Sequence, residues 1–210
     1  MTQVPETFGT LLLRRRMCRH FAAEAVDADV VTRLADAGLH GPSAGNTKAI
    51  HLLVLTTDLD RASFWHVAGA GRSDRWLTGM SAAPVLIMVS TSQHDYEMRY
   101  SLADKQDQLL SVDGDRAGFP APWWWVDAGM AAMLILLAAA EEGLGACFFG
   151  LPVGREQAIA GVFEIPGDRS VAGVIAVGHP LAGESSGPSR TGPVVNRVHL
   201  GRWGREPGPS

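Results

Sequence analysis

The hydrophobic positions of the chain follow two spacings, which predict a mixture of helices and strands. Over residues 29–39, apolar side chains such as Val31 and Leu34 recur at helical spacing, and glycines mark the end of the segment. Residues 50–56 and 84–90 are short apolar runs that predict strands, and the second is so uniformly apolar that we expect both of its faces to be covered. Further helices are predicted over residues 7–16, 58–67, 127–143 and 155–163, and further strands over residues 146–149 and 171–177.

Two segments break this pattern because they are polar or rich in glycine and proline. Residues 91–122 hold most of the charge in the middle of the chain and end in a Gly/Pro-rich turn, so we expect an excursion from the core with one or two short helices. Residues 181–210 are rich in Gly, Ser and Pro and predict an extended arm. The remaining elements predict helices on both sides of one sheet, an α+β sandwich that forms a single domain over residues 1–210.

Composition and charge narrow the classes of partner. The formal net charge is −4 and the pI is near 5.9, which argues against a nucleic-acid-binding surface. The longest uncharged apolar run, residues 128–140, is shorter than the roughly 20 residues of a transmembrane helix, so we expect a buried core or interface helix and no membrane partner. The first ten residues lack the pattern of a signal peptide, and Cys18 and Cys147 are expected to be reduced thiols, so we expect a cytoplasmic protein.

A cluster of arginines near the N-terminus is the clearest candidate for chemistry. Four arginines lie within residues 14–19 of an otherwise acidic chain. Guanidinium groups match the oxygens of a phosphate, so Arg15, Arg16 and Arg19 can hold an anion of that kind. The alternative is a solvated basic patch at the C-terminus of a helix, where the helix dipole favours positive charge.

Two turns offer uncharged binding groups. Residues 41–46 bring together a hydroxyl, an amide side chain and backbone N–H groups, although ordinary surface turns have the same composition. Gly150 and Leu151 follow a short apolar strand and can present a backbone N–H at the edge of the sheet, with a plain loop as the alternative. The sequence lacks the common motifs of phosphate loops, zinc peptidases and serine hydrolases, and its seven histidines are scattered, so metal catalysis has little support.

Several short motifs follow one another in a fixed order along the chain. They are RRxxRxF at residues 15–21, PSAGN before a strand, a long helix with the pattern DxGxA that ends in GLG, and VHLGRW at residues 198–203. Together they resemble the nitroreductase superfamily of FMN-dependent oxidoreductases, over roughly residues 10–70 and 123–203.

The resemblance implies a three-layer α/β/α sandwich with a mostly antiparallel central sheet, and an intertwined homodimer with two FMN sites at its interface. In such a site Arg15, Arg16 and Arg19 would hold the phosphate and ribityl end, and Arg190 of the arm would close on the phosphate. Met17 stands where members usually have serine, so only its backbone would serve. A turn of the partner subunit would reach the flavin through Pro42, Ser43, Ala44 and Asn46. The loop after the strand, at Gly150 and Leu151, would face the flavin with a backbone N–H.

The resemblance also implies a reaction, in which hydride passes from NADH or NADPH through FMN to an organic acceptor such as a nitro compound or a quinone. Because the flavin carries this chemistry, no catalytic side chain and no metal ligand is assigned. Enzymes on the same scaffold also dehydrogenate or dehalogenate natural products, and a protein that binds or stores FMN without turnover is a further alternative. The last alternative is a dimer that binds an anion other than FMN and carries no flavin. One departure bears on this choice, because Lys48-Ala49-Ile50 stands where members usually carry Gln-Pro-Trp.

We expect the binding site for the electron acceptor within the charged segment of residues 91–122. We predict that residues 91–122 form a lid, in which side chains such as Tyr96, Glu97 and Arg99 grip a zwitterionic or carboxylate substrate; a solvated surface helix is the alternative. The three tryptophans at 123–125 are expected to pack in the core or the dimer interface rather than to wall the substrate cleft.

Overall fold

Four strands form one antiparallel sheet in the computed structural model, which describes residues 7–109, 118–183 and 197–205. The strands are β1 (His51–Leu55), β2 (Val85–Thr91), β3 (Gly145–Phe149) and β4 (Ser170–Gly178). Their order in the sheet is β1-β2-β4-β3, so β2 and β4 are central and β1 and β3 lie at the edges.

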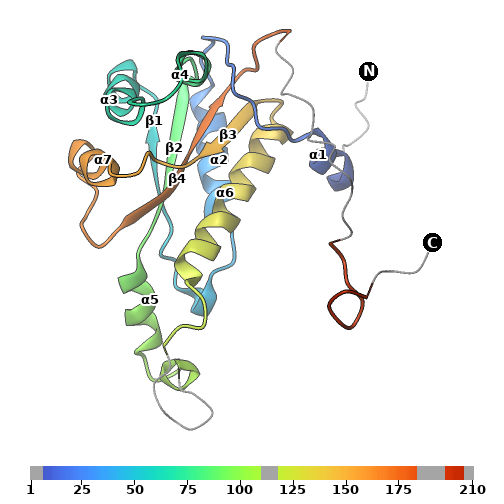
Figure 1. Cartoon of the computed structure of the whole chain (residues 1–210), viewed down its shortest axis with the longest axis vertical. Coiled ribbons are helices and arrows are strands. Elements are labelled where there is room, and N and C mark those ends of the chain that lie inside the picture. The colour runs from blue at the N-terminus through green and yellow to red at the C-terminus, as the bar shows by residue number, and fades with distance from the viewer. Residues whose placement is uncertain (1–6, 110–117, 184–196, 206–210) are drawn as a thin grey trace.

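Helices cover both faces of this sheet, as the sequence predicts (Figure 1). They are α1 (Phe8–Arg14), α2 (Ala28–Leu39), α3 (Asp58–Ala68), α4 (Asp74–Ser81), α5 (Gln93–Tyr100), α6 (Trp123–Glu141) and α7 (Glu156–Val162), with short 3-10 turns at Ala44–Asn46 and Gln106–Leu109. α2 and α6 pack on one face, and α3, α4 and α7 pack on the other. The predicted α+β class and the three-layer α/β/α sandwich with an antiparallel sheet are therefore confirmed.

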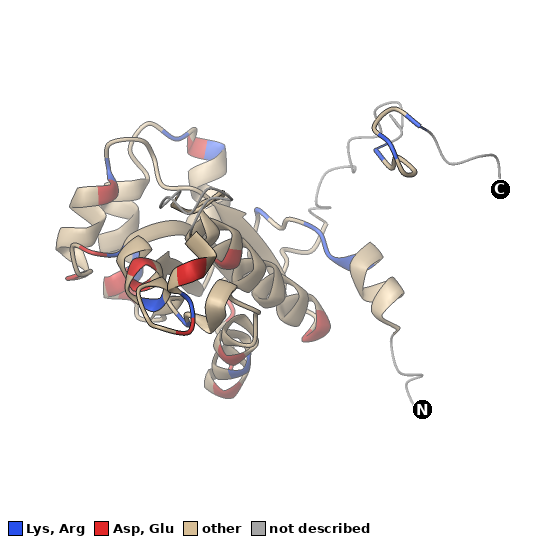
Figure 2. Cartoon of the chain, turned by 90° about the horizontal axis from the view of Figure 1, so that it is seen from below, with Lys and Arg blue, Asp and Glu red and all other residues tan. Residues whose placement is uncertain are grey.

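α1 and the segment 197–205 project from one side of the molecule (Figures 1 and 2). α1 buries none of its residues, and Leu13 and Phe8 are 76% and 65% exposed. In the segment 197–205, Trp203 is 91% exposed. Within the described residues, these apolar side chains have no cover from their own chain, which is typical of a surface that meets another molecule.

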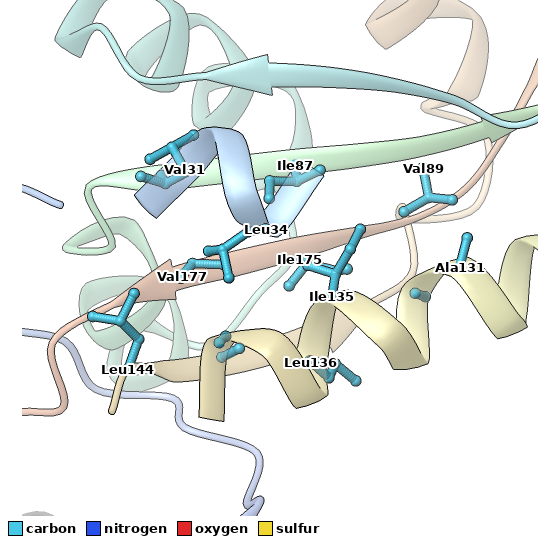
Figure 3. Packing of buried hydrophobic residues seen from close by; sticks show 14 of the residues in the cluster. Val31, Leu34, Ile87, Val89, Ala131, Ile135, Leu136, Leu144, Ile175 and Val177 are labelled. Carbon is cyan, nitrogen blue, oxygen red and sulfur yellow. The ribbon is translucent and has the colours of Figure 1, made fainter. Parts of the chain in front are cut away.

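The sheet face under α2 and α6 holds the larger apolar cluster (Figure 3). Leu34 of α2 and Ile135 of α6 have no exposed surface and lie in this cluster with Ile87 and Ile175 of the central strands. Gly38 lets the two helices approach closely, because a Cβ at this position would come within 2.7 Å of Cδ1 of Ile135. Burial of each large aliphatic side chain contributes about 1.5–3 kcal/mol, so this cluster fixes α6 on the sheet.

The opposite face packs against shorter helices. Phe64, Met80 and Ile159, one from each of α3, α4 and α7, are fully buried with Leu86 and Met88 of β2. Alternate residues of β2 therefore enter the two clusters, which explains why this strand is apolar at nearly every position. The predicted cover on both of its faces is confirmed.

The sequence prediction lacks α4. Its N-terminus is nevertheless marked, because the hydroxyl of Ser73 accepts a hydrogen bond from the Trp76 N–H at 3.4 Å. Glycines before and within this short helix obscure its hydrophobic spacing. Gly79 is required there, because a Cβ would collide with the backbone carbonyl oxygen of Arg19.

α6 begins at Trp123 rather than at residue 127, so the three tryptophans form its first turn. By length and apolar composition alone, it is the one helix in the described ranges that could cross a membrane. Eight of its residues are buried inside the chain, including Ala131 and Ile135, which is typical of the core helix of a globular domain. The prediction of a buried core helix is therefore confirmed.

Candidate functional site

The arginine segment leaves α1 and runs beside β3. Met17 forms an isolated parallel bridge with Ala146, and the Cys18 N–H donates to the Ala146 carbonyl at 2.9 Å. The Met17 side chain packs against both apolar clusters. Its side chain is therefore engaged in the core and is not available to a ligand.

A cavity of about 190 Å³ opens between this segment and the C-terminal end of α6. Arg15 and Arg16 line it, whereas Arg19 is exposed and does not. Arg14 donates from Nη2 to the Ala140 carbonyl at 2.5 Å, at the end of α6 where the last carbonyls of a helix lack partners within it. The structure thus brings two of the three predicted phosphate-binding arginines to one cavity.

One nitrogen of Arg15 is buried without a partner. Its Nη1 has no hydrogen-bond acceptor among the described residues. A buried donor that stays unpaired costs about 1–3 kcal/mol, and more on a charged group, so the folded chain carries a penalty that an acceptor reaching Nη1 would remove. Arg15 differs in this respect from a solvated basic patch.

The turn after α2 is held by its own left-handed residues. Gly45 and Asn46 have φ angles of +64° and +54°, a conformation that glycine and asparagine tolerate. The Asn46 N–H donates to the Ser43 carbonyl at 2.9 Å, and the Ser43 hydroxyl accepts from the Lys48 N–H at 3.3 Å. The residues of this turn therefore contribute to its shape through their own backbone conformation and hydrogen bonds.

This turn lines the largest of the described cavities, which has a volume of about 680 Å³. The cavity lies between α2, β1 and the first part of α6, with apolar walls and a polar rim of Ser43, Asn46 and Lys48. Lys48 is exposed and has a φ of +54°, which costs a residue other than glycine about 1–2 kcal/mol. The position at which the sequence departs from the family pattern thus places a strained cation at the rim of a cavity large enough for a small molecule.

A buried carboxylate that the sequence analysis leaves unassigned holds this turn. Asp127 of α6 is 4% exposed and accepts two hydrogen bonds on Oδ2, from the Ala44 N–H at 2.7 Å and from the Tyr96 hydroxyl at 2.6 Å. Burial, and then the hydrogen bond to Asp127, raise the pKa of Tyr96 far above its usual range, so its phenol stays protonated as the donor. The predicted DxGxA pattern marks the position of this aspartate but not its contact.

Gly150 and Leu151 follow β3 beside an aromatic cluster. Phe149 meets Trp76 edge to face with 5.4 Å between the ring centroids. Arg72 lies over the Trp76 ring, 4.6 Å from its centroid, and donates from Nη2 to the Gly150 carbonyl at 2.9 Å. In the described parts of the chain the Leu151 N–H has no acceptor.

The contacts of α5 contradict the predicted grip on a substrate. Tyr96 is fully buried, and Arg99 is bound to the two carboxylate oxygens of Asp104 at 2.8 and 2.7 Å and to the Gly45 carbonyl at 2.8 Å. Glu97 pairs with a side chain of its own helix, Gln93. These groups bind the chain itself, and the wider role of residues 91–122 as a lid stays a prediction.

The arginine cavity and the turn lie at opposite ends of α6. Arg14 contacts Ala140 near the end of the helix, and Ala44 contacts Asp127 near its start. These two positions are 13 residues apart, which is about 20 Å at a helical rise of about 1.5 Å per residue. Within one chain the two sets of predicted residues therefore do not meet, and Arg190 lies outside the described residues.

The two cysteines are not arranged as reactive thiols. Both are free, and burial raises the pKa of Cys18 and of Cys147. Over the same described ranges, no group of three or more His, Cys, Asp or Glu side chains is placed to hold a metal ion.

Comparison with known proteins gives a consistent result. The profile of the Nitroreductase family matches residues 12–179. A protein of Methanothermobacter thermautotrophicus, provisionally named NADH dehydrogenase/NAD(P)H nitroreductase, is 28% identical over 193 residues, which are 90% of this chain and 84% of that protein.

Two solved structures share the fold. An FMN-dependent nitroreductase from Clostridium difficile R20291 superposes with a TM-score of 0.68 at 18% identity, covering 92% of this chain and 98% of that one. A provisionally named nitroreductase from Desulfovibrio desulfuricans, solved in complex with FMN, superposes with a TM-score of 0.66 at 23% identity, covering 91% and 94% of the two chains.

Proposed function

Because the chain belongs to the nitroreductase family, we propose that it is an FMN-dependent oxidoreductase that passes hydride from NADH or NADPH to an organic acceptor such as a nitro compound or a quinone. The name of the relative from Methanothermobacter thermautotrophicus supports the nicotinamide donor, and the structure solved with FMN supports the cofactor. When bound, FMN supplies the hydride chemistry, and the protein binds and orients it.

The unpaired Nη1 of Arg15 is the observation that carries this proposal. A phosphate is a dianion with several acceptor oxygens, and it would satisfy a guanidinium that now has no partner in the described structure. Arg16 lines the same cavity, and Arg19 lies on the same extended segment. We assign the phosphate end of FMN to this cavity, with Arg190 as a further contact.

The edge of the flavin ring is assigned to backbone groups. The Leu151 N–H, just after β3, has no acceptor in the described structure, and the adjoining Gly150 has no side chain to block access. A flat ring with polar edges fits an apolar cleft with a few fixed N–H donors. The backbone of Met17 completes this part of the site, and no side chain is proposed as an acid or base.

We propose further that each site is shared between two copies of the chain. Pro42, Ser43, Ala44 and Asn46 lie about 20 Å along α6 from the arginines of their own chain, so the turn would reach the FMN that the arginines of the partner hold. Uncovered apolar side chains on α1 and at Trp203 support a partner in these positions. The unit would be a single domain over residues 1–210, with the excursion 91–122 and the arm 181–210.

An absorbance spectrum of the purified protein tests this proposal. We expect bound flavin, and we expect NADH or NADPH to bleach it without oxygen. Arg15→Ala should retain much less FMN, because it removes a guanidinium that we assign to the phosphate, whereas Arg33→Ala changes an exposed arginine that pairs with Glu142 and should retain it all. A colourless protein that FMN cannot reconstitute would refute the proposal, and bound flavin that stays oxidised with both donors would favour storage.

A further inference from the structure

A small network of hydrogen bonds joins three elements around one buried carboxylate. Asp127 of α6 accepts from the turn, through the Ala44 N–H, and from α5, through the Tyr96 hydroxyl. Both donors bond to the same oxygen, at 2.7 and 2.6 Å. A buried charge is costly unless it is hydrogen-bonded, so this carboxylate constrains both donors.

α5 contacts the next peptide of the same turn independently of Asp127. Arg99 donates from Nε to the Gly45 carbonyl at 2.8 Å. The ring of Tyr100 lies against Gly45 so closely that a Cβ there would come within 2.7 Å of Cε2 of Tyr100. Two successive residues of the turn are therefore held, one by α6 and one by α5.

The network borders the larger cavity directly. Asp127 lines the cavity of about 680 Å³ together with Pro42, Ser43 and Asn46 of the turn. The polar groups thus lie behind residues that we assign to the FMN site, and a shift of the Ala44 peptide would displace the side chains on either side of it.

We propose that Asp127, supported by Tyr96, is a positioning residue that sets the conformation of the Pro42–Asn46 turn at the FMN site of the partner subunit. This inference rests on the proposed function, because it concerns the affinity of that site for FMN. It also gives α5 a role, since the first helix of the excursion 91–122 braces the turn from behind.

Substitutions at the network separate positioning from fold stability. Asp127→Ala removes the acceptor of both donors, and we expect it to weaken FMN binding by about 10- to 100-fold, the effect of losing hydrogen bonds to a buried charge. Asp127→Asn keeps an acceptor oxygen and should restore binding to within about threefold, and Tyr96→Phe should weaken it by about three- to tenfold. Asp58→Ala is the control, because it removes an exposed aspartate that pairs with Arg61 of α3, on the opposite face of the sheet from the turn.

The measurements are the Kd for FMN, from quenching of flavin fluorescence, and the melting temperature of each apoprotein. A residue that only stabilises the fold would lower the melting temperature of the apoprotein and leave the Kd unchanged, and that result for Asp127→Asn and Tyr96→Phe would overturn the inference. Wild-type protein that does not bind FMN would instead overturn the proposed function, on which the inference rests.

Hybrid dimers, co-expressed with two different tags, test the action across subunits. When one chain carries Asp127→Ala and the other carries Arg15→Ala, both defects fall in one site, so we expect one tightly bound FMN per dimer. When one chain carries both substitutions and the other is wild type, each site has one defect and no tight FMN should remain. The reverse pattern would show that Asp127 acts on the site of its own chain, and one tight FMN per dimer in both hybrids would show that it does not act at all.

Discussion

The contact between Arg72 and Gly150 leads to a prediction about the loop after β3. The Gly150 carbonyl and the Leu151 N–H belong to the same peptide group, and in a trans peptide they point in opposite directions. Arg72 holds the carbonyl at 2.9 Å, so it also fixes the direction of the N–H that we assign to the flavin. Arg72→Met keeps an unbranched side chain of similar length and removes both the donor and the charge.

The size of the effect follows from two contacts. A hydrogen bond from a charged donor contributes about 1.5–3 kcal/mol when buried, and less here because the bond is exposed to solvent. The guanidinium over the Trp76 ring contributes about 0.5–1 kcal/mol. Arg72→Met should therefore lower the free energy of unfolding by about 1–2 kcal/mol, which is a fall in melting temperature of about 2–8 °C for a chain of this length. A less well oriented N–H should also raise the Kd for FMN by about three- to tenfold.

Thermal unfolding at one fixed protein concentration and titration with FMN measure the two effects. Arg75→Met is the matched control, because Arg75 lies in the first turn of α4, three residues after Arg72, and makes no hydrogen bond among the described residues; it should change neither quantity. Arg72→Lys keeps the charge near Trp76, so its melting temperature and its Kd for FMN should lie between those of Arg72→Met and Arg75→Met. An unchanged Kd beside a lower melting temperature would refute the link between Arg72 and the flavin, and an unchanged melting temperature would refute the contact itself.

Two further predictions concern stability. Gly45→Ala should lower the free energy of unfolding, measured in urea, by about 1–3 kcal/mol, because Gly45 has a φ of +64° and faces Tyr100. Gly161→Ala is the control, because Gly161 lies in α7 with no atom near its Cβ position. It should be neutral or stabilise the protein by up to about 1 kcal/mol. Burial raises the pKa of Cys18 and Cys147, so the unfolded chain loses these thiol protons at a lower pH than the folded chain does. The free energy of unfolding should therefore fall as the pH rises above about 8.5. The double Cys→Ala variant should lose less stability between about pH 8.5 and 10, and an equal loss would contradict this.

The elements that the sequence predicts are those whose pattern is local. The central strand β2 could be predicted because each of its residues is buried on one face or the other, which leaves an unbroken apolar run. α4 could not, because glycines interrupt its spacing, and Gly79 is there to admit a carbonyl from a segment 60 residues away. Such a requirement is set by tertiary packing and has no local signature.

The candidate site divides in the same way. The arginines and the turn stand out because their residue types are unusual for their surroundings, and the structure shows Arg15 with a buried unpaired nitrogen and Gly45 in a left-handed conformation. Asp127 and Tyr96 could not be assigned, because the contacts that give them a role join residues 83 and 31 positions apart. Charge and aromatic content suggested that α5 faces a substrate, but burial of Tyr96 shows that this polar group serves the interior.

The composition of α6 gives an independent argument for a second subunit. A helix that is apolar around its whole circumference needs cover on every side. Small residues such as Ala131 and Ala139 face the sheet and are buried, whereas Trp125, Met130 and Met133 on the rest of the surface are 42%, 41% and 37% exposed. The described residues of their own chain do not cover them, and the second subunit that we propose would. A copy of this chain is the partner that would also bring its turn to the arginine cavity, because the two lie at opposite ends of this same helix.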